Sequence, residues 1–167
     1  IEVKFASMLL EDDIIVPAVQ KDDDIFELSC PRLSTWPKED MKPFEAHVWL
    51  SIRNRNFAPT GLSYSFYPKP TFDTINPQIG HARGGTPLTI RGENFCDLGF
   101  GTTLVKIGSM AVIGTILNAN TIVCMSPMMS HGKYDVAVSF NGISFHHLTT
   151  IGANSSKPIP IKFIVAD

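Results

Sequence analysis

A short segment near the start of the sequence recurs in its second half. VKFASM, residues 3–8, returns as VKIGSM, residues 105–110. Three further matches follow in the same order: FELSCP with NTIVCMSP, HVWLSI with YDVAVSF, and LSYSFY with IKFIVAD. Segments that recur in one order indicate repeated structural units. In this alignment Cys30 and Cys124 take equivalent core-facing positions, so we expect both to be buried thiols that act as small hydrophobic groups.

The pattern of apolar residues within each copy predicts β-strands. Helical periodicity is almost absent, and short alternating runs are broken by Gly, Pro, Asn and Asp. The run KYDVAVSF is followed by Asn141-Gly142, a strong signal for a hairpin turn. TPLTIRG and IPIKFIVAD have the character of further strands. The sequence therefore predicts an all-β sandwich.

The two copies are unequal in extent. The second includes a glycine-rich opening from residue 69 onward, whereas the first begins at what would be its third strand. We therefore expect residues 1–68 to be the C-terminal part of a first module and residues 69–167 to be a complete one. Half a sandwich cannot bury its faces alone. The opening strands of the first module are then absent from this sequence or come from another chain.

The glycine-rich opening, NPQIGHARGGTPLTIRGENF, raises the question of a phosphate-binding loop. Such a loop needs glycines between a strand and a helix, and here no helical pattern follows. We predict instead that Gly80, Gly84 and Gly85 form turns with positive φ and that Gly92 ends the second strand. No nucleotide or other cofactor is expected.

The order of these residues closely resembles the IPT/TIG family of immunoglobulin-like domains. The matching positions are Asn76-Pro77, Gly80, Gly84-Gly85-Thr86, Gly92 and Asn94-Phe95, followed by VKIG at 105–108, IVCMSP at 122–127 and the run from Val136 to Phe145. The resemblance implies an immunoglobulin-like β-sandwich, with one complete IPT/TIG module preceded by part of another. It also implies a non-catalytic module of the kind that recurs in cell-surface receptors and adhesion proteins.

Residues that could carry chemistry do not form a recognisable site. The acidic runs at 11–13 and 22–24 lack the alternating oxygen ligands of a calcium loop. His146 and His147 are adjacent, so on a strand their side chains point to opposite faces and make a poor zinc pair. No nucleophile elbow and no glycosidase-like carboxylate pair can be identified. We expect no metal, no catalytic residue and no enzymatic activity.

Two covalent modifications remain open. A Cys96–Cys124 disulfide is the alternative to buried free thiols, since both residues fall in the second module. The three cysteines are an odd number, so they do not identify the redox compartment. Asn154 begins the sequon NSS in a lengthened hairpin loop and is a candidate glycosylation site if the protein is secreted.

Three functions fit these observations. The first is an extracellular recognition or adhesion protein with tandem modules and a protein partner, whose parent protein could be anchored in a membrane. The second is an intracellular, filamin-like scaffold associated with the cytoskeleton. The third is a transcription-factor dimerisation module, although the net charge of −2 gives no basis for nucleic-acid binding.

A protein partner would need an exposed surface with anchoring side chains. In HVWLSIRNRNF, the alternation predicts Val48, Leu50 and Ile52 inside and His47, Trp49, Ser51 and Arg53 outside. Tyr67 ends the neighbouring strand and is expected on the same face. Because Trp, Tyr and Arg are enriched at binding hot spots, we predict that Trp49 and Arg53, with His47 and Tyr67 beside them, form the binding face. The alternative is that Trp49 packs against its own module.

Overall fold

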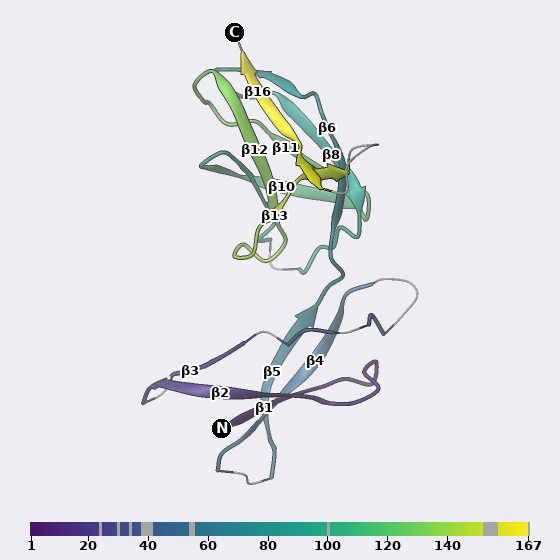
Figure 1. The fold of residues 1–167 in the computed structure, drawn as a ribbon, viewed down its shortest axis with the longest axis vertical. Coiled ribbons are helices and arrows are strands. Elements are labelled where there is room, and N and C mark those ends of the chain that lie inside the picture. Colours follow the sequence, from purple (N-terminus) through teal and green to yellow (C-terminus); the bar gives the residue numbers. More distant parts are fainter. Residues whose placement is uncertain are drawn as a thin grey trace. The chain divides into compact units, whose positions relative to one another are not determined.

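The computed structural model describes residues 1–23, 25–29, 31–33, 35–37, 42–53, 56–99, 101–151 and 157–166. The chain divides into two compact units, Ile1–Pro68 (unit 1) and Lys69–Asp167 (unit 2). The described residues form strands, turns and loops, with no helix among them, and Figure 1 labels the strands. The chain is thus all-β, as predicted.

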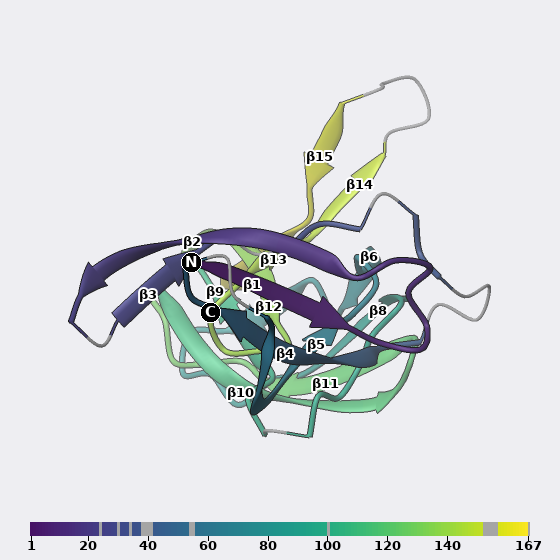
Figure 2. The same cartoon turned by 90° about the horizontal axis from the view of Figure 1, so that it is seen from below.

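The strands of the two units run in chain order from β1 to β16. Unit 1 contains β1 (Glu2–Ala6), β2 (Ile14–Asp22), β3 (Ile25–Leu28), β4 (Phe44–Ser51) and β5 (Ala58–Phe66). Unit 2 contains β6 (Thr71–Asn76), β7 (Ile79–His81), β8 (Pro87–Glu93), β9 (Leu104–Ile107), β10 (Met110–Asn118), β11 (Thr121–Met125), β12 (Gly132–Ser139), β13 (His146–His147), β14 (Thr149–Ile151), β15 (Pro158–Pro160) and β16 (Lys162–Ala166). Figure 2 shows β14 and β15 as a hairpin that projects from the rest of unit 2.

Unit 2 is an immunoglobulin-like sandwich whose strands are paired in the order β6-β8-β11-β10-β9-β12-β16-β7, with β13 also paired to β12. Strand β10 belongs to both layers. Its first half, from Met110 to Ile113, pairs with β9, and its second half, from Gly114 to Asn118, pairs with β11. One layer therefore holds β6, β8, β11 and the end of β10, and the other holds the start of β10 with β9, β12, β16 and β7.

The core of unit 2 lies between these layers, because each strand turns alternate side chains inward. The first layer contributes Phe72, Ile75, Leu88, Ile90, Ile122 and Cys124, all buried. The second contributes Val105, Ile107, Val136, Val138, Phe163 and Val165, also buried. Burial of apolar area at about 25 cal/mol per Å² is the main term that stabilises such a sandwich.

The four glycines singled out in the opening stretch have two different roles. Gly84 and Gly85 adopt φ of 73° and 75°, values that favour glycine in a turn. Gly80 and Gly92 instead lie within β7 and β8 without a positive φ, so the prediction of a turn at Gly80 is wrong, whereas β8 ends at Glu93, one residue after Gly92. Each is needed because its neighbours leave no room for a Cβ: the Phe163 ring at Gly80, and the Thr71 carbonyl oxygen at Gly92.

Unit 1 is a five-stranded sheet with the order β3-β2-β1-β4-β5, which matches the order β11-β10-β9-β12-β16 in unit 2. The register matches as well. Val3 pairs with Val16 and Leu50, as Val105 pairs with Val112 and Val138. Strand β2 is shared between β1 and β3 as β10 is shared between β9 and β11, with a register shift near the end of each.

This register corrects the sequence alignment at β3. Leu28 pairs with Ala18, as Cys124 pairs with Gly114. Leu28, and not Cys30, therefore holds the position that corresponds to Cys124, and Cys30 lies outside the described residues. The shared cysteine-to-proline spacing misled the alignment, because register is set by the backbone ladder and not by residue identity.

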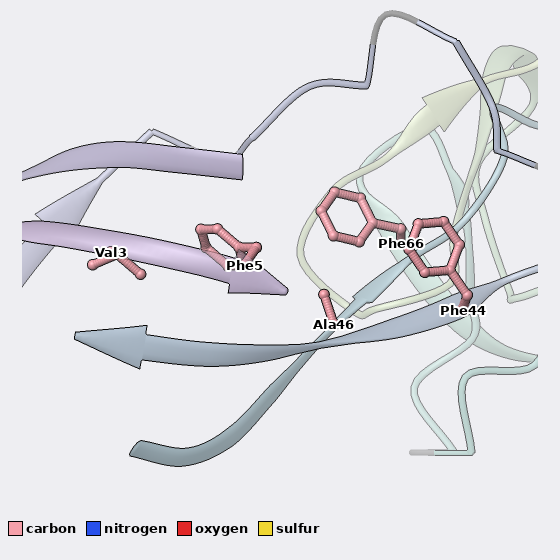
Figure 3. Close-up of a cluster of buried hydrophobic side chains, with 5 residues drawn as sticks. All are labelled: Val3, Phe5, Phe44, Ala46 and Phe66. Atoms are coloured by element: carbon pink, nitrogen blue, oxygen red, sulfur yellow. The ribbon is translucent and has the colours of Figure 1, made fainter. Parts of the chain in front are cut away.

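The core of unit 1 is a cluster on the inner face of β1, β4 and β5: Val3, Phe5, Phe44, Ala46 and Phe66 (Figure 3). The rings of Phe44 and Phe66 stack at 5.1 Å, and Trp36 meets Phe44 edge-on at 5.4 Å. Leu9 and Leu10 from the β1–β2 loop and Leu33 from the β3–β4 connection also pack on this cluster. Loop residues thus help to cover a face on which unit 2 places strands.

Candidate protein-binding surface

A row of side chains crosses the outer face of the unit 1 sheet. Lys4 pairs with Ile15 on one side and with Trp49 on the other, and Trp49 pairs with Pro59. Inward residues flank Lys4 at Val3 and Phe5, so Lys4 and its cross-strand partners belong to the opposite face. Ile15 is 50% exposed. We call Ile15, Lys4, Trp49 and Pro59 the Trp49 row.

Trp49 is half-buried and lies beneath a lysine ammonium. Lys4 Nζ is 5.0 Å from the centre of the Trp49 ring and 5.2 Å from that of Phe57, distances at which a cation is attracted to an aromatic face. The same ammonium forms an ion pair with Asp13 Oδ2 at 3.1 Å. The row thus presents an aromatic surface with a positive charge, held in place by a carboxylate.

The indole nitrogen of Trp49 is a further feature of this surface. Nε1 is buried and has no hydrogen-bond partner among the described residues. An unpaired buried donor costs about 1–3 kcal/mol. The indole N–H therefore makes an unfavourable polar contribution to the stability of unit 1.

The predicted alternation of β4 holds through Leu50 and then fails. Ser51 was expected outside but is buried, and Ile52 was expected inside but is 49% exposed. Ile52 departs from the pattern because β4 ends at Ser51 and the chain then turns at Arg53, which has φ of 55°. Residues beyond a strand no longer follow its period of two. Ser51 still lies within β4 and pairs with Glu2, so it shares the face of Trp49 and is nevertheless buried there.

The other three predicted binding residues do not all lie beside Trp49. His47 is exposed on the same strand and pairs with Ala6 and Ser63. Arg53 lines a depression of about 490 Å³ that meets the row at Pro59, together with Leu50, Ile52, Asn56, Ala58 and Thr60. Tyr67 is half-buried and follows the end of β5.

Unit 2 has a related arrangement at the equivalent positions. Lys106, which matches Lys4 in register, places Nζ 5.5 Å from the ring of Phe145. Ala137 holds the position of Trp49 and is buried. The depression of about 300 Å³ at this place is lined by Lys106, Gly108, Lys133, Tyr134, Asp135, Ala137, Phe145 and His147. Sequence reasoning missed both lysines, although their alternation with Val3 and Val105 marks them as outward-facing.

The cysteine and glycan predictions have different outcomes. Cys96 and Cys124 are buried free thiols, so the Cys96–Cys124 disulfide is not formed in the structure. Burial raises the pKa of both thiols to about 11, and the charge of Asp97 contributes at Cys96. Asn154 lies outside the described residues, and its glycosylation stays a prediction.

The described residues hold no group of three or more His, Cys, Asp or Glu side chains placed to bind a metal ion. His146 is half-buried, and burial, followed by the charge of Lys69, lowers the pKa of its imidazole. His147 is exposed. In the described part of the chain there is no helix with the length and apolar character of a membrane span.

The fold defines an immunoglobulin-like β-sandwich protein, a class in which function lies in grafted surfaces and not in the fold itself. Residues 70–156 match the family model described as IPT/TIG domain. The chain belongs to the IPT/TIG domain family, as the resemblance in its sequence implied.

Known proteins with similar sequence or structure are much longer than this chain. Fibrocystin-L of Mus musculus is 25% identical over 127 residues, which are 74% of this chain and 3% of that protein. The extracellular region of plexin A4, domains 1 to 10, has a TM-score of 0.46 at 13% identity and covers 99% of this chain and 18% of that one. SGBP-B of the Bacteroides ovatus mixed-linkage glucan utilization locus, in complex with a heptasaccharide, has a TM-score of 0.40 at 14% identity and covers 99% and 39%.

Proposed function

We propose that this chain is a protein-recognition or adhesion segment of a larger cell-surface protein with tandem IPT/TIG modules, and that the Trp49 row binds its protein partner. Membership of the IPT/TIG family supports a non-catalytic recognition module. The occurrence of such modules in receptors and adhesion proteins supports the proposed location at the cell surface. The observation that carries the binding site is the aromatic and cationic row on the outer face of unit 1.

The chemistry of the row suits a protein partner. A half-buried indole in contact with the Lys4 ammonium already has part of its rotamer freedom restricted, so its ordering costs little on binding. Pro59 adds apolar area beside Trp49, and Ile15 adds more on the far side of Lys4. A carbonyl or carboxylate oxygen of the partner can accept a hydrogen bond from Lys4 Nζ in place of Asp13. The interface would then contain a charge-assisted hydrogen bond.

The test is binding of the multimerised chain to intact cells, measured by flow cytometry before and after the cells are treated with trypsin. A protein partner requires that trypsin abolish the binding. Trp49→Ala should weaken it by about 2 kcal/mol, roughly 30-fold, while the free energy of unfolding of unit 1 changes by about 1 kcal/mol or less. Leu62→Ser is the matched control, because Leu62 is 65% exposed and does not belong to the row.

Either of two results would assign Trp49 a structural role. Trp49→Ala could unfold unit 1, or it could leave cell binding equal to that of the Leu62→Ser control. In both cases the side chains of the Trp49 row would only pack on the outer face of the unit 1 sheet and would not bind a partner.

A second candidate is the intracellular, filamin-like scaffold. The free thiols of Cys96 and Cys124 favour it, because reduced cysteines persist in the cytosol. Expression of the parent protein in cells, followed by biotinylation with a reagent that cannot cross the membrane, separates the two. Labelling supports the cell-surface proposal, whereas an unlabelled, expressed protein supports the scaffold.

A further inference from the structure

The depression of about 300 Å³ on unit 2, which we call the Lys106 hollow, has a lining of mixed chemistry. It combines an aromatic ring, two ammonium groups, a carboxylate and an imidazole, which belong to Phe145, Lys106, Lys133, Asp135 and His147. Strands β9, β12 and β13 carry these side chains, apart from Phe145, which directly precedes β13. Because β12 pairs with both β9 and β13, the backbone ladder holds these groups at one place on the sheet.

The hollow lies where unit 2 has a small residue. Lys106 pairs with Ala137, as Lys4 pairs with Trp49 in unit 1. In unit 1 the indole of Trp49 occupies the space beside the lysine, whereas in unit 2 the single methyl group of Ala137 leaves that space open. The same register position therefore carries a large side chain in unit 1 and part of the lining of a hollow in unit 2.

The Lys106 hollow carries an excess of positive charge. Asp135 Oδ1 is 2.8 Å from Lys162 Nζ, so an ion pair balances the charge of this carboxylate. Within the part of the chain that the structure describes, neither Lys106 nor Lys133 forms an ion pair. Lys106 Nζ is instead 5.5 Å from the centre of the Phe145 ring. Two ammonium groups without carboxylate partners attract an anion and can donate charge-assisted hydrogen bonds to it.

The remaining groups suit a ligand that has more than a negative charge. Phe145 is half-buried, so part of its ring stays open to contact with an apolar surface. The Asp135 oxygen outside the ion pair, Oδ2, can accept a hydrogen bond from a hydroxyl group, and the exposed His147 ring can donate or accept one. Small-ligand pockets have volumes of about 300–1,000 Å³, so the Lys106 hollow has room for a single sugar-sized ring.

We propose that the Lys106 hollow binds a hexuronic acid residue of a glycan, at a site on unit 2 that does not depend on the Trp49 row. The sugar carboxylate accepts a hydrogen bond from Lys106 Nζ, and Lys133 adds a second positive charge beside it. The C–H face of the pyranose ring packs on Phe145, and a ring hydroxyl donates to Asp135 Oδ2. An acidic side chain of a protein fits less well, because it has no hydroxyl for Asp135 and no flat C–H face for Phe145.

The test is a titration of isotopically labelled residues 1–167 with methyl β-D-glucuronide and with methyl β-D-glucoside, followed by the amide chemical shifts in NMR spectra. The two sugars differ only in carrying a carboxylate or a hydroxymethyl group. The glucuronide should shift the amides of β9, β12 and β13 saturably, with a Kd of about 1–10 mM. The glucoside should bind roughly tenfold more weakly, because it lacks the charged acceptor for Lys106. Salt at about 0.15 M screens charges that do not contact the sugar.

Three variants assign the two parts of the sugar to their side chains. Lys106→Gln should weaken glucuronide binding roughly fivefold or more and leave glucoside binding unchanged, because only the glucuronide has the carboxylate. Phe145→Ala should weaken the binding of both sugars, because both present the same C–H face. Arg91→Gln is the matched control: it also removes one positive charge, from an exposed position on β8 in the other layer, and both affinities should persist.

The proposal fails if the glucuronide produces no saturable shift or if the glucoside binds as tightly. It also fails if N-acetylglutamate α-amide binds as tightly as the glucuronide, a result that would assign the hollow to an acidic side chain of a protein. Equal losses from Lys106→Gln and Arg91→Gln would show that the sugar responds to the overall charge of unit 2 and not to this hollow. If the amide spectrum shows that Phe145→Ala unfolds unit 2, the comparison of Lys106→Gln with Arg91→Gln decides, because neither of these residues is buried.

Discussion

The turn at Gly84 and Gly85 allows backbone strain and steric overlap to be separated in one pair of substitutions. Both residues have nearly the same left-handed φ, 73° and 75°. They differ in surroundings. A Cβ on Gly84 would lie 2.6 Å from the backbone nitrogen of Met128 and from the carbonyl carbon of Pro127, whereas a Cβ on Gly85 would meet nothing within 4 Å.

The magnitudes follow from this difference. Gly85→Ala incurs only the cost of an L-residue in the left-handed region, about 1–2 kcal/mol. Gly84→Ala incurs the same cost and must also displace the backbone at Pro127 and Met128, which adds about 1–3 kcal/mol for an overpacked site. That backbone is not free to move, because Ser126 N donates to Thr86 O at 2.9 Å and Gly85 N donates to Ser126 O at 2.8 Å. We expect Gly84→Ala to destabilise unit 2 by at least 1 kcal/mol more than Gly85→Ala.

The assay must report on unit 2 alone. Both tryptophans, Trp36 and Trp49, lie in unit 1, so tryptophan fluorescence follows unit 1 and serves as the control. Urea titration followed by amide exchange at β11 and β12 gives the free energy of unfolding of unit 2. Equal losses for the two variants, or a larger loss at Gly85, would refute the steric argument. A change in the fluorescence transition would show that the effect is not confined to unit 2.

Two further predictions concern titratable groups in unit 2. Because burial raises the pKa of Cys96 and Cys124 from 9.0 to about 11, both thiols should resist disulfide reagents near pH 8 until urea unfolds unit 2, as mapped by mass spectrometry. Their contribution to stability is complete below pH 9.0 and is lost as the pH rises toward about 11, since the unfolded thiols release their protons first. Burial and Lys69 lower the pKa of His146 below 6.5, so the unfolded imidazole binds a proton at higher pH than the folded one. Unit 2 should therefore lose stability as the pH falls below about 6.5 in urea titrations, and His146→Gln should reduce that loss, whereas His147→Gln, at an exposed residue, should not.

The fold class could be predicted because alternation and turn residues are local signals. The run around Val136 and Val138 predicted a strand with an inward apolar face, and both residues are buried. Gly84 and Gly85 were identified as turn glycines from the loss of strand pattern around them, and both have positive φ. Gly80 could not be understood in this way, because the Phe163 ring that excludes a Cβ there comes from a distant strand.

The candidate surface was only partly predictable. The alternation of apolar residues in β4 indicated that Trp49 faces away from the core. It could not show that Lys4 lies opposite Trp49, because that pairing depends on the register of β1 against β4. The end of β4 at Ser51 was not visible in the sequence either, so the inward position predicted for Ile52 was wrong. A shift of one residue in the pairing of a strand moves its side chains to the other face of the sheet.

The two units share a lysine in one register position and differ in the aromatic group beneath it. In unit 2 the ring belongs to Phe145, just before β13, and β13 pairs with β12 beside the buried Ala137. In unit 1 the strand that corresponds to β12 itself carries the ring, as Trp49, and the ring of Phe57 is also near Lys4 Nζ, at 5.2 Å. The lysine–aromatic contact is therefore a property of both sheets and does not by itself mark a binding site. Unit 1 differs in having the large indole of Trp49 at the position of Ala137. It also has the half-exposed Ile15 on the other side of the lysine, where unit 2 has Ala111. This added apolar and aromatic surface is the specific reason to place the partner on unit 1 and not on unit 2.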